Sequence, residues 1–273
     1  MIGPLGATFT STAEMSASVA PPLFFSNVLR NMNGTVWSYW QGDPSPTVEM
    51  CLRSWETQLG SSWTIRVLNG DSFHDFDIIK PRRFDDLTET MKSDVIRLSL
   101  LLLYGGVWMD ASVYLSRNLD WLMEFEDHPY FGYCYHNEHI ESWFIHAKAG
   151  DPSIRMWLEN LNAIIDRNEE SYFSVYDAFK QGVRESADFR STYKSIPFLK
   201  ACFDTKVAFY DKTRPLKRHT GHMIKFINSD RLHFDNLLLN RDRVCSLCVL
   251  MLWVTVCGAV ACMMLRAKKA IRT

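Results

Sequence analysis

The chain has 273 residues, enough for one large domain or two small ones with a hydrophobic core. Its 30 Lys and Arg residues nearly balance its 31 Asp and Glu residues, so it offers no electrostatic surface for nucleic acid, and we exclude that class of partner. Hydrophobic residues make up 47% of the chain and aromatic residues 13%, which excludes disorder over most of the length.

The N-terminal part predicts a flexible arm and then the start of an α/β domain. Residues 1–26 are rich in Ser, Thr, Ala, Gly and Pro and show little periodicity. A strand is predicted at 36–40, a helix at 46–59 and a second strand at 63–68, with turn residues between them. This order is typical of a parallel sheet covered by helices, and we expect the domain to span 27–240.

The middle of the chain continues this pattern. A helix is predicted over 86–104 and closed by two glycines, followed by a strand at 107–109 that Asp110 interrupts and that resumes at 113–115. Asp151-Pro152 predicts the start of a further helix. Residues 168–240 alternate between helical and strand-like pieces whose order the pattern does not give.

Residues 244–265 differ from the rest because they contain no charged residue, amide, imidazole or proline. As a helix they would be roughly 33 Å long, close to the thickness of the hydrocarbon layer of a bilayer. We therefore predict a transmembrane helix there, a lipid bilayer as a partner and a single-pass membrane location, with 266–273 as a basic tail. The alternative is a buried core helix, which at this length would normally carry a polar stripe.

Three charged residues suggest a binding site. Asp94 and Arg97 share one face of the predicted helix, either as a surface ion pair or as a pair buried near a sheet edge. Asp110 lies between two apolar runs, where an unpaired carboxylate would be costly to bury, so it needs a hydrogen-bond partner or a cation. At the carboxyl end of a parallel strand it would face the crevice where α/β sheets bind ligands.

The ordered motif around these residues resembles a known family. Ser93-Asp94-x-x-Arg97, an apolar helix and then 104–112, YGGVWMDAS, resemble the DxD-containing glycosyltransferases of the family 32 type, and most of all the capsular polysaccharide synthesis proteins. The resemblance covers about 34–165 and includes 36–42, Ser54-Trp55 and 141–144. It implies a GT-A-like, Rossmann-type mixed sheet flanked by helices, a nucleotide-sugar donor, retention of anomeric configuration and a divalent cation, Mn²⁺ or Mg²⁺.

The resemblance also implies roles for individual residues. Asp110 would bind the cation with Ser112, directly or through a water, although the general pattern has a second aspartate at position 112. Arg97 would meet the donor diphosphate, and Asp94 would bind donor sugar hydroxyls or orient Arg97. The expected donor-binding set is Trp37, Tyr39, Asp94, Arg97, Gly105, Gly106, Asp110, Ala111 and Ser112. The candidates for the acceptor side are Glu138, Glu141 and Trp143. For the two glutamates, an ordinary surface role is an equally good interpretation.

The predicted function is that of a membrane-anchored glycosyltransferase acting on a glycan, glycolipid or polysaccharide acceptor. Two other classes stay open. A catalytically inactive relative could serve as a binding or scaffolding subunit of a membrane glycosylation complex, which Ser112 would permit. A metal-dependent phosphohydrolase is the third class, and it would normally need more clustered Asp and His residues.

Overall fold

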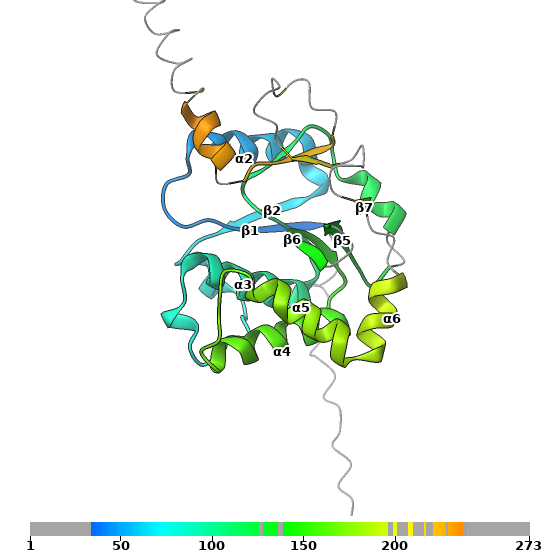
Figure 1. Cartoon of the computed structure of the whole chain (residues 1–273). Helices are drawn as coiled ribbons and strands as arrows, with labels where there is room; N and C mark the ends of the chain where they lie inside the picture. Colours follow the sequence, from blue (N-terminus) through cyan, green and yellow to red (C-terminus); the bar gives the residue numbers. More distant parts are fainter. Residues whose placement is uncertain are drawn as a thin grey trace, which may run out of the picture.

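A six-stranded mixed sheet with helices on both faces forms the centre of the fold (Figure 1). The computed structural model describes residues 34–125, 128–135, 139–195, 199–200, 207–209, 216, 221–227, 229–236 and 238. The predicted N-terminal arm at 1–26, the predicted transmembrane helix at 244–265 and the basic tail at 266–273 lie outside these residues.

The strands of the main sheet pair in parallel except on the two sides of β6. Its strand order is β2-β1-β3-β6-β5-β7. Strand β1 pairs in parallel with both β2 and β3, whereas β6 runs antiparallel to its neighbours β3 and β5. The strands are β1 (Thr35–Tyr39), β2 (Thr64–Leu68), β3 (Gly106–Met109), β5 (Tyr130–Tyr135), β6 (His139–Ala147) and β7 (Leu199–Lys200).

A second, three-stranded sheet lies beside the carboxyl end of β3. Its order is β4-β9-β8, from β4 (Val113–Leu115), β9 (Met223–Lys225) and β8 (Val207–Phe209). Strand β4 follows β3 directly in the chain, whereas β9 comes from more than 100 residues further on, and the two pair antiparallel with Val113 opposite Lys225. The small sheet therefore brings a late part of the chain to the end of β3.

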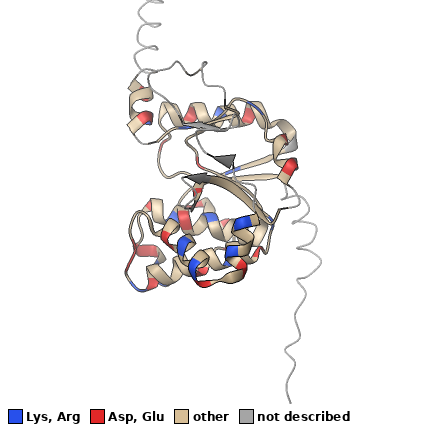
Figure 2. Ribbon diagram, turned by 45° about the vertical axis from the view of Figure 1, so that its right-hand side comes forward, with Lys and Arg blue, Asp and Glu red and all other residues tan. Residues whose placement is uncertain are grey.

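The helices cover the two faces of the main sheet. Helix α2 lies on one face, and α3, α4 and α5 lie on the other (Figure 1). Charged residues lie mainly on these helices, while the strands between them are mostly uncharged (Figure 2). The α-helices are α2 (Pro46–Leu59), α3 (Glu89–Tyr104), α4 (Pro152–Asp166), α5 (Ser174–Glu185) and α6 (Ala187–Ser195), and the 3₁₀-helices are Gly60–Ser62, Ser72–Asp75, Phe84–Asp86 and Asp120–Phe125.

Helix α3 is the element that positions the site, and its ends follow from its sequence. The Thr88 side chain caps its N-terminus by accepting a hydrogen bond from the Met91 N–H. At the other end Gly105 has φ +68°, and a Cβ there would lie 2.7 Å from the backbone nitrogen of Ala149. Only glycine fits this position, because the chain must adopt a left-handed conformation in close contact with the segment that follows β6.

The structure confirms the predicted mixed α/β sheet flanked by helices, including the strand–helix–strand start and the helix at Pro152. Helix α3 begins at Glu89 rather than at Asp86, because Phe84–Asp86 forms a separate 3₁₀ turn. The stretch from 168 onward, which the pattern did not order, contributes α5, α6 and β7–β9. The GT-A assignment itself stays a prediction.

The predicted fold class is wrong in its last element, the transmembrane helix. In the described part of the chain no helix is sufficiently long and apolar to cross a membrane. The longest described helix, α3, has 16 residues, short of the roughly 20 that a bilayer requires. This finding contradicts the predicted transmembrane helix and single-pass membrane location, and residues 244–265 themselves lie outside the described part.

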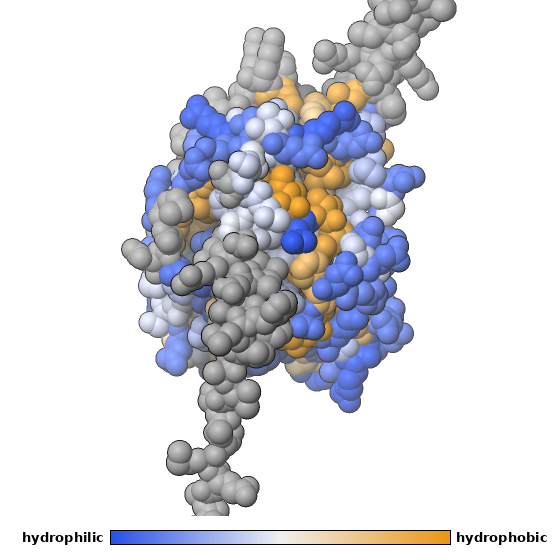
Figure 3. All heavy atoms as spheres, turned by 180° about the vertical axis from the view of Figure 1, so that it is seen from behind, coloured by the Kyte–Doolittle hydropathy of each residue, from blue (hydrophilic) through white to orange (hydrophobic). Residues whose placement is uncertain are grey.

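Some hydrophobic side chains are exposed. Seen from behind, hydrophobic side chains form an irregular vertical strip near the middle of the surface, bordered by hydrophilic side chains (Figure 3). Among the exposed large hydrophobic residues are Val67 on the edge strand β2 and Ile79 in the segment before α3. Exposed apolar residues are ordinary on a globular domain, whereas buried polar and charged groups indicate sites.

Candidate functional site

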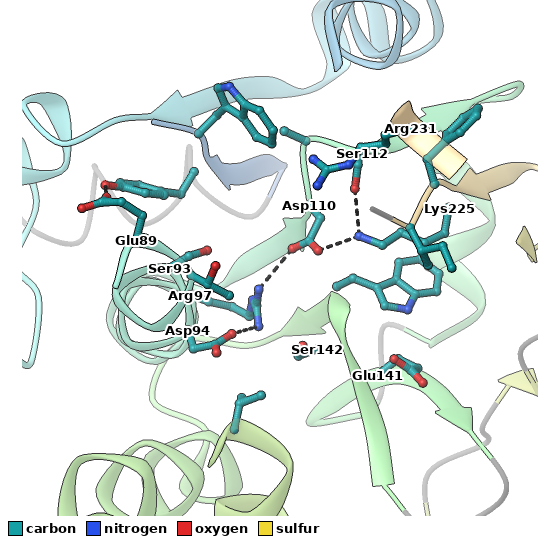
Figure 4. Close-up of a pocket in the computed structure, with 18 of the residues that line it drawn as sticks. Glu89, Ser93, Asp94, Arg97, Asp110, Ser112, Glu141, Ser142, Lys225 and Arg231 are labelled. Carbon is teal, nitrogen blue, oxygen red and sulfur yellow. Dashed lines mark hydrogen bonds and ion pairs between the residues drawn. The ribbon is translucent and has the colours of Figure 1, made fainter. Parts of the chain in front are cut away.

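A pocket of about 1140 Å³ lies at the carboxyl ends of β1 and β3, between α3 and β9 (Figure 4). This is the edge at which open α/β sheets bind ligands, because the loops that follow parallel strands converge there. The lining comes from the end of β1, the N-terminal half of α3, the turn after β3, the middle of β6, the region around α5 and the chain after β9. The lining residues lie within 39–41, 89–97, 110–112, 141–143, 172–176, 225–227 and 229–231.

Helix α3 places a buried ion pair on its side of the pocket. Arg97 Nη1 donates to Asp94 Oδ1 at 2.5 Å, and the two side chains are only 5% and 10% exposed. The guanidinium also lies over the Trp108 ring, 4.9 Å from its centroid. Of the two interpretations open from the sequence, the structure therefore confirms a buried pair and not a surface ion pair.

Asp110 lies where β3 ends, and its side chain accepts hydrogen bonds from three groups. Its Oδ1 accepts from Arg97 Nη2 at 3.1 Å and from Trp108 Nε1 at 2.9 Å, and its Oδ2 accepts from Lys225 Nζ at 2.6 Å. The Asp110 backbone N–H donates to the Trp143 carbonyl at 2.9 Å, which ties the turn to β6. The sequence indicated that Asp110 needs a partner if it is buried, and the structure gives it two cationic partners, Arg97 and Lys225.

Lys225 reaches this carboxylate from β9. Its ammonium also donates to Ser112 Oγ at 2.9 Å, and the residue is only 7% exposed. The backbone holds the same contact in place, because the Phe226 N–H donates to the Ser112 carbonyl at 3.0 Å. Asp94, Arg97, Asp110 and Lys225 thus form a continuous row of alternating charges across the pocket (Figure 4).

The two aspartates of this row differ in their pKa. Burial raises the pKa of Asp94 to about 6, since Arg97 offsets only part of the desolvation. Burial alone would also raise the pKa of Asp110, but the charges of Lys225 and Arg97, with the hydrogen bonds from Lys225 and Trp108, hold it well below its usual range. Burial lowers the pKa of Lys225 despite the attraction of Asp110.

Aromatic and charged side chains form the rim on the β1 side. The Tyr39 hydroxyl donates to Glu89, and burial, followed by this contact, raises the pKa of the phenol well above its usual value. The Arg231 guanidinium lies over the Trp40 ring, 5.3 Å from its centroid. Arg231 belongs to a helical segment at 229–236, drawn in orange beside α2 in Figure 1.

That segment is anchored to the N-terminus of α2. The Thr47 N–H donates to Asp235 Oδ1 at 2.7 Å, and the Thr47 hydroxyl donates to the same oxygen at 2.5 Å. An acidic side chain at a helix N-terminus is favourable because it accepts from unpaired backbone N–H groups and complements the helix dipole. This contact places Arg231 beside the pocket.

The opposite wall comes from β6 and α5. The Tyr176 hydroxyl donates to Glu141 Oε2 at 3.4 Å, and Ser142 Oγ donates to the Tyr176 oxygen at 3.2 Å. Burial raises the pKa of Glu141, which lines the pocket together with Trp143. Glu138, the other acceptor candidate, lies outside the described residues.

The pocket brings together most of the residues singled out from the sequence: Tyr39, Asp94, Arg97, Asp110, Ala111, Ser112, Glu141 and Trp143. Trp37, Gly105 and Gly106 lie elsewhere. The Trp37 side chain is fully buried, and its indole N–H donates to the Gly105 carbonyl at 2.9 Å. Gly105 and Gly106 join α3 to β3, so these three residues are part of the scaffold behind the site.

Sequence reasoning missed several lining residues, including Trp40, Tyr176, Lys225 and Arg231. For Lys225 a signal was present in the sequence. It is a single cation inside the apolar run 223–227, MIKFI, just as Asp110 is a single anion between two apolar runs. One buried cation and one buried anion in short strands are candidates for a pair.

The side chains around Asp110 do not fit the divalent cation that the resemblance implies. Both candidate ligands, Asp110 and Ser112, already bind the Lys225 ammonium. Among the described residues no group of three or more His, Cys, Asp or Glu could hold a metal ion. Binding of Mn²⁺ or Mg²⁺ stays a prediction from the resemblance.

Comparisons with known proteins agree with the motif. Residues 24–208 match the family described as capsular polysaccharide synthesis protein. Over 157 residues, 48% of this chain, the chain is 29% identical to the O-glycosyltransferase braB of Annulohypoxylon truncatum and 31% identical to the glycosyltransferase afumC of Aspergillus fumigatus. The matches cover 37% and 40% of those two proteins, so the chain spans about two fifths of the curated relatives.

Among solved structures, the PaToxG glycosyltransferase is similar with a TM-score of 0.42 at 12% identity, over 63% of this chain and 79% of that chain. The family match, in contrast, extends from the segment before β1 to β8 and includes Asp94, Arg97, Asp110 and Ser112. It covers well over half of the sequence and confirms the resemblance that the ordered motif indicated. The chain therefore belongs to the family of capsular polysaccharide synthesis proteins.

Proposed function

We propose that the chain is a glycosyltransferase, which moves a sugar from a nucleotide-sugar donor to a hydroxyl group of a glycan, glycolipid or polysaccharide acceptor. Family membership and the names of the two relatives support this class of reaction. The observation that carries the proposal is the buried row Asp94–Arg97–Asp110–Lys225 at the carboxyl end of β3. It offers cations for an anionic leaving group and carboxylates for sugar hydroxyls in one pocket.

On the donor side, the diphosphate is the group that Arg97 and Lys225 would bind. In the transfer, the bond between the anomeric carbon and the diphosphate oxygen breaks, and its electron pair stays on the diphosphate. Fixed cations lower the barrier because they stabilise this developing charge without having to reorganise. Asp94 uses Oδ1 for Arg97, so its other carboxylate oxygen is the group proposed to accept hydrogen bonds from the donor sugar.

On the acceptor side, the wall formed by β6 and α5 supplies the groups. Glu141 and Tyr176 present oxygen atoms to the pocket, and the rings of Trp143 and Tyr172 are surfaces on which a sugar ring can pack. We propose that Glu141 accepts a hydrogen bond that orients the acceptor hydroxyl. The hydroxyl proton then passes to an oxygen of the departing diphosphate as the new glycosidic bond forms on the same face of the donor sugar. Retention of anomeric configuration, implied by the family resemblance, is part of the proposal.

The test is release of nucleoside diphosphate from a panel of nucleotide sugars by the full-length chain, with and without oligosaccharide acceptors. We expect one donor to be cleaved, Asp110→Asn to slow the cleavage by about tenfold or more, and the matched surface variant Asp85→Asn to behave like the wild type. The anomeric configuration of the product, measured by NMR, tests retention.

Two outcomes of this assay would contradict the proposal. Tight binding of a nucleotide sugar with no turnover toward any acceptor would favour the inactive binding subunit. Release of phosphate from simple phosphate esters, with no sugar transfer, would favour a phosphohydrolase.

A further inference from the structure

The side chain of Lys225 occupies the place where a cation would bind between Asp110 and Ser112. Its Nζ lies 2.6 Å from Asp110 Oδ2 and 2.9 Å from Ser112 Oγ. A magnesium ion held by the same two oxygens would lie about 2.0–2.1 Å from each and would therefore overlap the ammonium. With Lys225 in this position, the two cations exclude each other.

We propose that Lys225 is a built-in cation of the donor site, whose ammonium binds the nucleotide diphosphate in place of a divalent metal ion. The inference rests on the proposed glycosyltransferase function and deepens it. It names the group that neutralises the leaving diphosphate and makes donor binding independent of divalent metal.

The residues around Lys225 fit this role. An ammonium has three N–H donors, and the contacts to Asp110 and Ser112 use two of them, which leaves one for a ligand in the pocket that Lys225 lines. The Trp143 ring lies on another side, 5.7 Å from Nζ, and adds a further surface favourable to a cation. The side chain is 9% exposed, so water competes weakly for that third donor.

The same arrangement explains why position 112 is serine. A divalent ion is commonly held by one or two carboxylates, and the general family pattern has a second aspartate here. A single ammonium needs only one counter-charge, which Asp110 supplies, and Ser112 then contributes a neutral acceptor. A second carboxylate beside Lys225 would add a buried negative charge and repel the diphosphate.

The backbone fixes the ammonium at this point. Lys225 lies opposite Val113 in the antiparallel β4–β9 pair, and the Phe226 N–H to Ser112 carbonyl bond continues that pairing toward Asp110. Because successive residues of a strand alternate between its two faces, a shift of one residue would turn Lys225 away from Asp110. The register of β9 therefore decides whether the pocket has this cation.

The test is calorimetric titration of the full-length chain with UDP, GDP, ADP and CDP, in EDTA and again in saturating Mn²⁺. We expect at least one nucleotide to bind with the same Kd in both conditions, within about twofold. Lys225→Met should weaken binding in EDTA by about tenfold or more, the loss typical of a charge-assisted hydrogen bond. Lys225→Arg should keep part of the affinity, and the exposed Lys148→Met should match the wild type.

A second titration, with Mn²⁺ alone, needs no nucleotide. The wild type should not bind Mn²⁺ at this site, whereas Ser112→Asp combined with Lys225→Met, which has two carboxylates and no ammonium, should gain a Mn²⁺ site. Thermal melts of each variant show that it is folded, and the comparison of EDTA with Mn²⁺ on the wild type depends on no variant.

Nucleotide binding by the wild type only in the presence of Mn²⁺ would overturn the built-in cation and leave the proposed glycosyltransferase function standing. Unchanged affinity in folded Lys225→Met would do the same. No binding of any nucleoside diphosphate, in either condition, would overturn the proposed function as well.

Discussion

Two sides of the pocket, helix α3 and the end of β3, hold their aspartates in different ways. On α3, Asp94 has one cationic partner, Arg97, and lies one helical turn from it. At the end of β3, Asp110 lies between the same Arg97 and Lys225 and also accepts from Trp108. With one cation, burial prevails and the pKa of Asp94 rises to about 6, whereas with two cations the pKa of Asp110 falls below its usual range. The number of cations around a buried carboxylate therefore affects how readily it takes up a proton.

The largest expected effect comes from removing Asp110, the carboxylate that both cations of the row contact. Asp110→Asn leaves Arg97 and Lys225 buried with Asp94 as the remaining anion of the row, so the free energy of unfolding should fall by about 3–5 kcal/mol. Turnover should fall by about tenfold or more, because Lys225 loses its charged partner. Denaturant unfolding and donor cleavage measure the two effects, and an unchanged unfolding midpoint would show that the row does not support the fold.

Removing Arg97, the cation that contacts both aspartates, should have the next largest effect. Arg97→Ala should cost about 3 kcal/mol of stability, because it leaves the buried Asp94 without its cation and close to Asp110. Breaking an exposed ion pair would cost only a few tenths of a kcal/mol. Affinity for nucleoside diphosphate should fall by about 1.5–3 kcal/mol, and Arg97→Lys should recover only part of it, because an ammonium lacks the planar fork. Calorimetric titration with a thermal melt measures both, and a loss of stability with full affinity would remove Arg97 from the donor site.

The difference in pKa between the two aspartates predicts a smaller, pH-dependent effect. The pKa of Asp94 is about 6 in the folded chain against a model-peptide value of 3.8, so the folded state binds the proton more tightly than the unfolded state. Its contribution to stability is complete below pH 3.8 and is lost as the pH rises through about 6. The difference in unfolding free energy between the wild type and Asp94→Asn should shrink by about 1–3 kcal/mol over that range and stay constant above pH 7. Parallel pH profiles of the two proteins would contradict the shift.

The smallest expected effect distinguishes a scaffold residue behind the site, Trp37, from a residue that lines the pocket, Trp40. Trp37→Phe removes the hydrogen bond from the indole to the Gly105 carbonyl and should cost about 1 kcal/mol of stability. Affinity for nucleoside diphosphate should not change, because Trp37 does not line the pocket. Weaker nucleotide binding at unchanged stability would return Trp37 to the donor site. Trp40→Phe, at the rim, is the matched variant in which binding should change.

The sequence predicts the Asp94–Arg97 pair on α3 well and the contacts of Asp110 at the end of β3 poorly. Asp94 and Arg97 lie three residues apart on one helix, so local periodicity is enough to place them together. Asp110 stands out because an isolated carboxylate between apolar runs needs a partner. The identity of that partner depends on tertiary structure, since Lys225 lies 115 residues further on, in a strand of three residues.

Trp37 and Trp40 show the same limit within one short segment. Both follow the start of the first strand, and the sequence singled out Trp37 for the donor site. In the structure Trp37 packs in the core against Phe76 and Tyr104, whereas Trp40, just past the end of β1, lines the pocket. Alternation along a strand predicts which residues share a face, but only the packing of α3 and the 229–236 segment decides which residue after the strand faces the pocket.

The contacts that complete the pocket also have a kinetic consequence. The Thr47–Asp235 bond spans 188 residues of chain, whereas the Asp94–Arg97 pair spans three. Because the entropy cost of closing a loop grows with its length, and folding slows as contacts become more distant in sequence, we expect the helix pair to form early and the 229–236 segment to dock late. In the reverse direction this segment is the part of the pocket that can detach while the sheet stays folded, so amide hydrogens there should exchange with solvent sooner than those of β1 and β3.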